Sequence, residues 1–193
     1  MMTGRRWLFM GVLAAAGLLI GAGAIIASVA VNRYTSTDAF CTSCHTMATL
    51  AADPHYLNSA HRANAEGVHA SCGDCHIPQT SWFAETYAHA VDGITDVVAE
   101  FTHDYSNPAL WNARRVQLAH IVRQEMRRDD SVTCRHCHDA DAIKPASEQG
   151  RAAHALLRQG RLTCIDCHFN LVHAPVPPTM AFIRSSGING GAK

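Results

Sequence analysis

Eight cysteines in this chain fall into four pairs, and a histidine follows each pair immediately. Two residues separate the cysteines of a pair, so the pattern C-x-x-C-H occurs four times and leaves no cysteine over. The paired cysteines are Cys41 and Cys44, Cys72 and Cys75, Cys134 and Cys137, and Cys164 and Cys167. A pattern repeated this strictly indicates four copies of one kind of site.

The C-x-x-C-H spacing is the attachment signature of c-type haem. Two thiols one helical turn apart bond to the two vinyl groups of the haem, and the adjacent histidine becomes an axial ligand of the iron. Zinc sites, redox dithiols and disulfide frameworks also use paired cysteines, but none of them requires histidine after the second cysteine. The sequence therefore predicts four covalently bound c-type haems, with motif ligands His45, His76, His138 and His168.

The N-terminal segment has 25 consecutive uncharged residues, from Trp7 to Val31. At about 1.5 Å per residue this run is about 38 Å long, enough to cross a hydrocarbon layer of about 30 Å. Arg5 and Arg6 precede it, so the positive-inside rule places the N-terminus in the cytoplasm and the chain after Asn32 in the periplasm. A cleavable signal peptide is the alternative, but its apolar region usually has about 7–15 residues. We therefore expect a retained single-pass anchor in the inner (cytoplasmic) membrane.

The spacing of the motifs indicates how the rest of the chain is organised. Their first cysteines are 31, 62 and 30 residues apart in turn, which predicts two dihaem halves. The intervals of about 30 residues between motifs are too short to build an apolar core from side chains alone, and we expect the haems to form the centre of the domain. We therefore expect a mostly α fold with much irregular chain and no sheet. The predicted divisions are an anchor over residues 1–32, a tetrahaem domain over 33–178 and a flexible tail over 179–193.

The one long interval between motifs predicts two helices. From Phe83 to Tyr105 apolar residues recur at helical spacing, and the opposite face is polar. Residues 114–128 predict a second helix. The formal net charge is zero, so no basic field indicates nucleic acid as a partner.

Several stretches resemble the NapC/NirT/NrfH family of membrane-anchored tetrahaem quinol dehydrogenases. They are the segment from Phe40 to Met47, the segment from His61 through Gly67 to His76, residues 131–138, and residues 163–168 followed by His173 and Pro175. The resemblance implies a protein that takes electrons from membrane quinol and passes them to a periplasmic oxidoreductase or cytochrome. Two positions depart from the family pattern. Gln79 stands where related sequences often have histidine, and His89 stands where they often have lysine.

The resemblance also implies further iron ligands. Met47 matches a methionine that ligates the first haem, and either His45 or Met47 remains open as that ligand. His61, His154 and His173 match the distal ligands of the other three haems. Which distal histidine serves which haem stays open at this point.

Asp96 and His89 match the region near the first haem where the family oxidises quinol. Quinol oxidation releases two protons with two electrons, and a carboxylate and an imidazole can accept those protons. The alternative is that both residues belong to an ordinary solvated helix face.

Other functions remain to be weighed against quinol oxidation. A relay between protein partners needs no quinone site, electrons can also flow into the quinone pool, and a haem reductase needs an open iron in a roomy pocket. The anchor and Met47 favour quinol oxidation.

Overall fold

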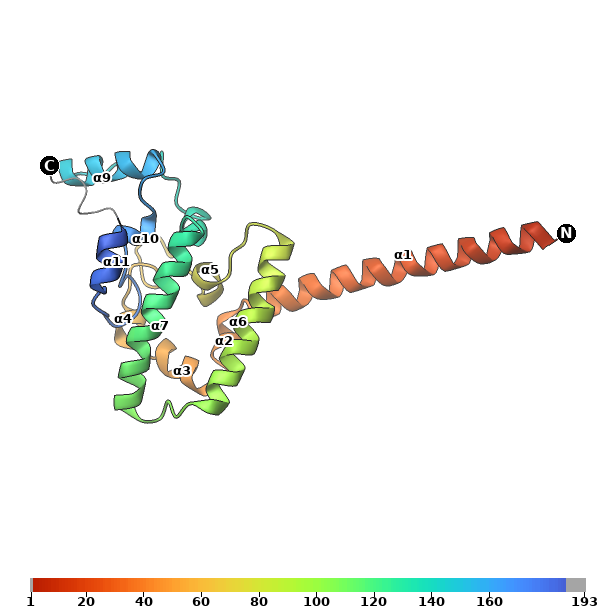
Figure 1. Ribbon diagram of the computed structural model, residues 1–193, viewed down its shortest axis with the longest axis horizontal. Coiled ribbons are helices and arrows are strands. Elements are labelled where there is room, and N and C mark those ends of the chain that lie inside the picture. The colour runs from red at the N-terminus through yellow and green to blue at the C-terminus, as the bar shows by residue number, and fades with distance from the viewer. Residues whose placement is uncertain (1, 187–193) are drawn as a thin grey trace.

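The computed structural model describes residues 2–186, and over that range the chain consists of helices and irregular segments without a strand. Figure 1 shows one long N-terminal helix that projects from a compact group of shorter helices. The expectation of a mostly α fold is confirmed. The helices are α1 (Met2–Thr35), α2 (Asp38–Cys41), α3 (His45–Ala51), α4 (Pro54–Leu57), α5 (Cys72–His76), α6 (Trp82–Thr102), α7 (Pro108–Arg128), α8 (Val132–Arg135), α9 (Glu148–Arg158), α10 (Cys164–Cys167) and α11 (Met180–Ser185).

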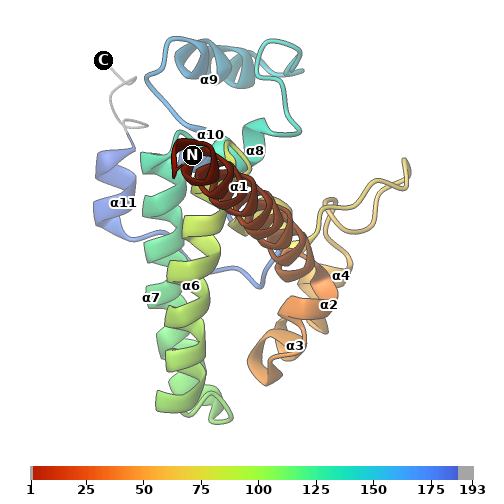
Figure 2. The same ribbon diagram turned by 90° about the vertical axis from the view of Figure 1, so that its right-hand side faces the viewer.

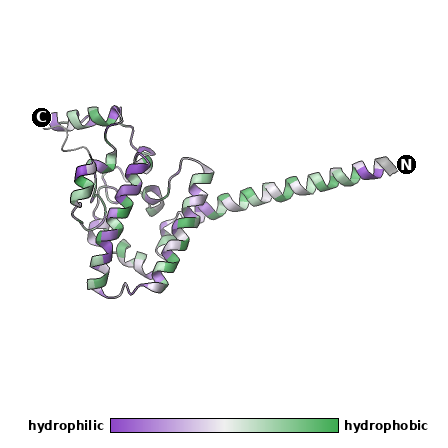
Figure 3. Ribbon diagram, viewed as in Figure 1, coloured by the Kyte–Doolittle hydropathy of each residue, from purple (hydrophilic) through white to green (hydrophobic). Residues whose placement is uncertain are grey.

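Helix α1 contains the predicted anchor. Its span from Gly4 to Thr35 has a mean hydropathy of 2.3 over its most apolar window, and none of that window is buried against the rest of the chain. Figure 3 shows the helix apolar around most of its surface along its free length. Over its free length the helix is apolar on all sides and needs an apolar surrounding, so α1 has the length and composition of a membrane-crossing helix.

Helices α6 and α7 occupy the long interval between the second and third motifs, and Figure 1 shows them running in opposite directions and diverging from the loop that joins them. The predicted end of α6 at Tyr105 is wrong, because the helix stops at Thr102 and His103 takes an extended conformation. Helix α7 begins six residues before the predicted start at Arg114. The Asn107 side chain caps it by accepting from the Ala109 amide at 3.0 Å, and Pro108 fills the first helical position.

The polypeptide buries little apolar surface of its own. Its accessible surface is 13518 Å², against about 9,000 Å² for a compact monomer of this mass. The projecting anchor accounts for part of the excess, and exposed motif residues account for more, since Cys44, Cys137 and Cys167 are exposed. The buried apolar residues are Tyr56, Ala88, Leu157, Leu162, Ile165, Val176 and Phe182. This thin core is what a domain organised around large cofactors requires.

The prediction of a flexible tail from residue 179 is wrong for the part of it that the structure describes. Residues Met180–Ser185 form α11, which Thr179 caps by accepting from the Phe182 amide at 3.1 Å. Phe182 is only 1% exposed, the most deeply buried of the apolar core residues. The nearby proline and glycine residues indicated a loop, but the burial of the Phe182 side chain stabilises a short helix there. Residues 187–193 of the predicted tail lie outside the described part.

Candidate haem-binding site

Two of the four motifs form a single capped helical turn. In α5 and α10 the residue before the first cysteine, Ser71 or Thr163, donates its backbone amide to an aspartate two residues after that cysteine. The distances are 2.8 Å to Asp74 and 2.7 Å to Asp166. This reciprocal cap stabilises the turn, and the turn brings both cysteines of a motif to one side of the helix.

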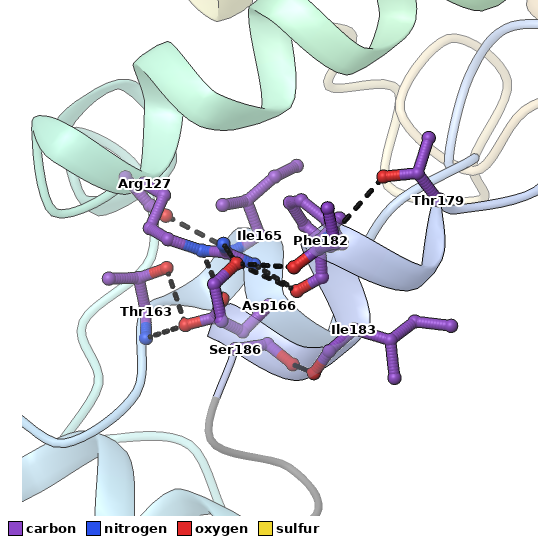
Figure 4. Close-up of polar contacts among 11 residues, drawn as sticks. Arg127, Thr163, Ile165, Asp166, Thr179, Phe182, Ile183 and Ser186 are labelled. Atoms are coloured by element: carbon purple, nitrogen blue, oxygen red, sulfur yellow. Dashed lines mark hydrogen bonds and ion pairs between the residues drawn. The ribbon is translucent and has the colours of Figure 1, made fainter.

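The fourth motif is fastened to α7 and α11 by an ion pair. Arg127 donates from Nε to Asp166 Oδ1 at 2.6 Å, and its guanidinium lies 3.9 Å over the Phe182 ring. Figure 4 shows these groups converging from α7, α10 and α11. Asp166 is only 3% exposed. Its buried carboxylate accepts hydrogen bonds from Arg127 and from the Thr163 amide, which replace its contacts with water.

The first and third motifs are built differently. Cys41 ends α2 and Cys44 lies just before α3, so the first motif spans a break between two helices. The third motif follows Ser131, which takes the left-handed conformation with φ of 52° and is completely buried. Ser131 Oγ accepts a hydrogen bond from the Ile165 amide at 3.1 Å, and this bond ties the third motif to the fourth.

The first and second motifs lie side by side. Asp38 Oδ1 accepts from the Cys72 amide at 2.8 Å, while Asp38 Oδ2 accepts from Arg62 at 2.7 Å. The thiols of Cys41 and Cys72 interact with each other, and this interaction lowers the pKa of Cys41 and raises the pKa of Cys72. Gly73 leaves no room for a side chain, because a Cβ there would lie 2.6 Å from the Ser36 carbonyl oxygen.

The remaining motifs continue this series. Helix α5 packs against α8, which places the second motif beside the third. The thiols of Cys134 and Cys164 interact with each other, and this interaction lowers the pKa of Cys164 and raises the pKa of Cys134. The four attachment sites are therefore neighbours in chain order, from the end of α1 to α10. All eight cysteines are free of disulfides, as haem attachment requires.

Three motif histidines each stand opposite one of the predicted distal histidines. The ring centroids are 6.0 Å apart for His61 and His138, 6.2 Å for His76 and His173, and 6.1 Å for His154 and His168. A metal–imidazole nitrogen bond is about 2.0–2.1 Å and the ring centroid lies about 1.1 Å beyond the nitrogen, so two imidazoles on opposite sides of one ion have centroids about 6.2 Å apart. The three pairs therefore fit the spacing of bis-histidine haem ligation.

The surroundings of these rings agree with that fit. The His154 Nδ1 atom is buried, and no residue in the described part of the chain forms a hydrogen bond with it. His76 is exposed at the surface, but neighbouring groups partly desolvate its imidazole and lower its pKa, and neutral imidazole is the form that ligates a metal. Desolvation also lowers the pKa of His173.

Arginines of α7 hold the segment that carries His173. Arg123 donates to Asn170 Oδ1 and to the Val176 carbonyl, both at 2.7 Å, and Arg115 donates to the Ala174 carbonyl at 2.6 Å. These two arginines were not singled out from the sequence, because nothing local marks them. The aspartates that cap α5 and α10 were missed as well, although a serine or threonine three residues before an aspartate is a readable signal.

The first motif lacks such a pair. Within residues 2–186 no histidine ring stands opposite His45. His45 begins α3 and Met47 follows two residues later. Residues two apart on a helix point about 200° from one another, so only one of these two side chains can face a given haem. The first site therefore differs in kind from the other three.

Helix α6 places acidic residues beside the first motif. Glu100 Oε1 accepts from the Thr46 amide at 3.3 Å, and Asp96 lies one turn before Glu100 on the same side of α6. His89 lies on the same face of α6 as Asp96 but two turns away, about 10 Å along the axis. It contacts the end of α1, with Nε2 at 3.0 Å from Ser36 Oγ. The structure thus brings Asp96 to the first motif and His89 to the end of the anchor.

These observations define a class of protein. A helical domain with a thin core, four haem-attachment motifs in spatial series and one apolar N-terminal helix is a membrane-anchored multihaem c-type cytochrome. Residues 4–179 match the model of the NapC/NirT cytochrome c family, N-terminal region, and the chain belongs to that family. Its cofactor is covalently bound c-type haem, and its class of activity is electron transfer.

Individual relatives agree with this assignment. A probable tetraheme cytochrome c-type protein of Nitrosomonas europaea is 38% identical over 165 residues, which are 84% of this chain and 69% of the relative. NapC of Haemophilus influenzae is 33% identical, with 81% and 78% of the two chains covered. TorC of Escherichia coli is 33% identical over 87% of this chain, but the match spans only 43% of TorC. No solved structure shows significant similarity to this chain.

Proposed function

We propose that this protein oxidises membrane quinol beside the first motif and passes the electrons along the series of motifs to a periplasmic oxidoreductase or cytochrome. The observation that carries the proposal is the position of Asp96. It lies one helical turn before Glu100, which accepts from the Thr46 amide next to the first motif, and that motif has no histidine pair. The same helix packs against the end of the anchor. Quinol is confined to the membrane, so its oxidation site has to lie where the anchor meets the domain.

The proposed ligand set follows from the ring pairs. His76 with His173, His138 with His61, and His168 with His154 hold the second, third and fourth irons, and Met47 holds the first. When bound, the four haems supply one-electron redox chemistry, and the protein sets their ligands and positions. A thioether ligand favours reduced iron, which makes the first site the one that differs in potential.

The polar residues of α6 receive the protons. Partial desolvation raises the pKa of Asp96, and the negative charges of Asp92 and Glu100 add to the effect. A carboxylate with a raised pKa is a better proton acceptor near neutral pH than an ordinary one. His89 supplies an imidazole at the end of the anchor, hydrogen-bonded to Thr35 and Ser36.

The orientation follows from the charges that flank the apolar run. Arg5 and Arg6 precede it, so the N-terminus lies in the cytoplasm and the haem domain lies in the periplasm, on the outer side of the inner membrane. The fourth motif is then the last in the series from the membrane and the exit for electrons.

The test is reduction of the purified, full-length, haem-loaded protein by a menaquinol analogue without oxygen. We expect rapid reduction in wild type, strongly slowed reduction in Asp96→Asn, and normal reduction of both by dithionite. Asp141→Asn, which changes an exposed aspartate of a distant loop, is the matched control. Wild-type haems that stay oxidised with excess quinol of lower potential contradict the proposal and leave the relay between protein partners.

A further inference from the structure

The apolar face of α6 lies outside the protein core. Phe83, Tyr87, Ile94 and Phe101 are 77%, 70%, 67% and 86% exposed. Val91, Val97 and Val98 are exposed on the same side. Within the described part of the chain, an apolar face of this extent on a 21-residue helix is left largely exposed, which marks it as a site for an apolar partner.

The anchor shows where this face lies relative to the membrane. Trp82, the first residue of α6, donates from Nε1 to Ser28 Oγ at 3.0 Å. Ser28 belongs to the last turn of the uncharged run that ends at Val31, so α6 begins at the depth where the anchor leaves the hydrocarbon layer. In Figure 2 the anchor points toward the viewer, and α6 runs across its direction in full view on that face of the domain.

Contacts between α1 and α6 also give the direction of the apolar face. Thr86 contacts Asn32 with 2.8 Å between Oγ1 and Nδ2, whereas His89 contacts Ser36, one turn further from the membrane. At 100° per residue, the step from Thr86 to His89 turns about 60° around α6, away from the apolar face. Trp82 also lies on that side of Thr86, so α1 covers the polar side of α6 and leaves the apolar face free. Figure 2 looks along the anchor from its N-terminal end and shows α6 on the face of the domain from which the anchor projects.

We propose that the apolar face of α6, formed by Phe83, Tyr87, Val91, Ile94, Val98 and Phe101, lies in the interfacial zone of the lipid bilayer. The helix begins at the membrane boundary and presents this face to the headgroups and upper acyl chains, as amphipathic interfacial helices do. Trp82 and Tyr87 stand near the anchor, where aromatic residues are favoured at the membrane boundary. The acidic residues of α6 lie on the other side, toward the haem motifs. The protein therefore contacts the membrane at two sites, α1 and α6.

This placement does not depend on which way electrons flow or on whether quinol is the substrate. It depends on α1 crossing a membrane and on the face of α6 being covered by lipid rather than by protein. The alternative is that a second copy of the chain covers this face. Samples that hold one copy per membrane patch distinguish coverage by lipid from coverage by a second copy.

The experiment measures how fast introduced cysteines react in the haem-loaded, full-length protein. The eight native cysteines are bonded to haem, so each variant carries one reactive thiol. Phe101→Cys and Ile94→Cys probe the apolar face, and Gln149→Cys on the exposed side of α9 is the matched control. The protein is placed in phosphatidylcholine nanodiscs with one copy per disc and treated with a hydrophilic, membrane-impermeant maleimide.

We expect both face variants to react about tenfold more slowly than Gln149→Cys, because lipid covers them. All three should react fully after denaturation, and haem content should be that of wild type. Equal rates for face and control variants overturn the proposal, because they place the face in water. Protection that appears only with two copies per disc, together with crosslinking of Phe101→Cys between copies, also overturns it and assigns the face to a dimer.

Discussion

The imidazole rings of His61 and His138 stand 6.0 Å apart, centroid to centroid, with their planes at 75°. His61 precedes the second motif in the chain, whereas His138 belongs to the third. In the proposed ligand set, the distal ligand of the third haem therefore comes from the N-terminal half of the domain. In the other pair that joins the two halves, His76 of the second motif faces His173, which follows the fourth motif, with 6.2 Å between ring centroids. Two of the three proposed irons thus join the halves of the domain to each other.

Removing His61 is expected to affect the haem at Cys134 and Cys137 rather than the haem of the nearer second motif. His61→Ala, His138→Ala and the double variant should each abolish the same single low-spin haem signal in electron paramagnetic resonance spectra. His69→Ala is the control, because His69 is exposed and has no ring partner in the described part of the chain. Loss of two different signals in the double variant contradicts this pairing.

Met47 is expected to set the potential of one haem only. Met47→Ala should lower the potential of the first haem and change its spectrum, because the thioether that favours reduced iron is gone. The three haems with histidine pairs should be unchanged in a spectroscopic redox titration. His45→Ala is the comparison variant, and a change in that variant with none in Met47→Ala assigns the ligand to His45 instead.

Quinol oxidation is expected to speed up with rising pH. The pKa of Asp96 is raised by desolvation and by Asp92 and Glu100, and only the deprotonated carboxylate accepts a proton. The rate should therefore rise as pH increases through this raised pKa, above the ordinary range of an aspartate. Stopped-flow reduction by quinol between acidic and neutral pH measures the profile. Asp96→Asn should flatten it, and an unchanged profile in that variant removes Asp96 from the proton path.

Much of the site was predictable because its information is local. The C-x-x-C-H motifs, the uncharged run and the amphipathic pattern of α6 each lie within a short stretch. The pairing of distal histidines was not predictable, since it depends on how Arg115 and Arg123 of α7 hold the segment around His173. Helix α11 was missed because its stability comes from the burial of Phe182 against Arg127 rather than from helix-forming composition.

The ion pair between Arg127 and Asp166 is expected to stabilise the C-terminal part of the domain. Asp166→Ala leaves the Arg127 guanidinium without its partner and removes the cap of α10. Loss of one partner of a buried pair should lower the free energy of unfolding by about 3 kcal/mol. Guanidinium unfolding followed by haem absorbance measures this, with exposed Asp141→Ala as the control. Equal midpoints for the two variants contradict the structural role of the pair.

The account as a whole depends on four haems of two kinds, three of them held by histidine pairs. The most direct test combines the intact mass of the purified full-length protein with near-infrared magnetic circular dichroism of its oxidised form. We predict a mass increase of four haem groups and bis-histidine bands whose intensity corresponds to three haems, with a separate methionine band for the fourth. Fewer than four covalent haems, or four equivalent bis-histidine haems, contradicts the account.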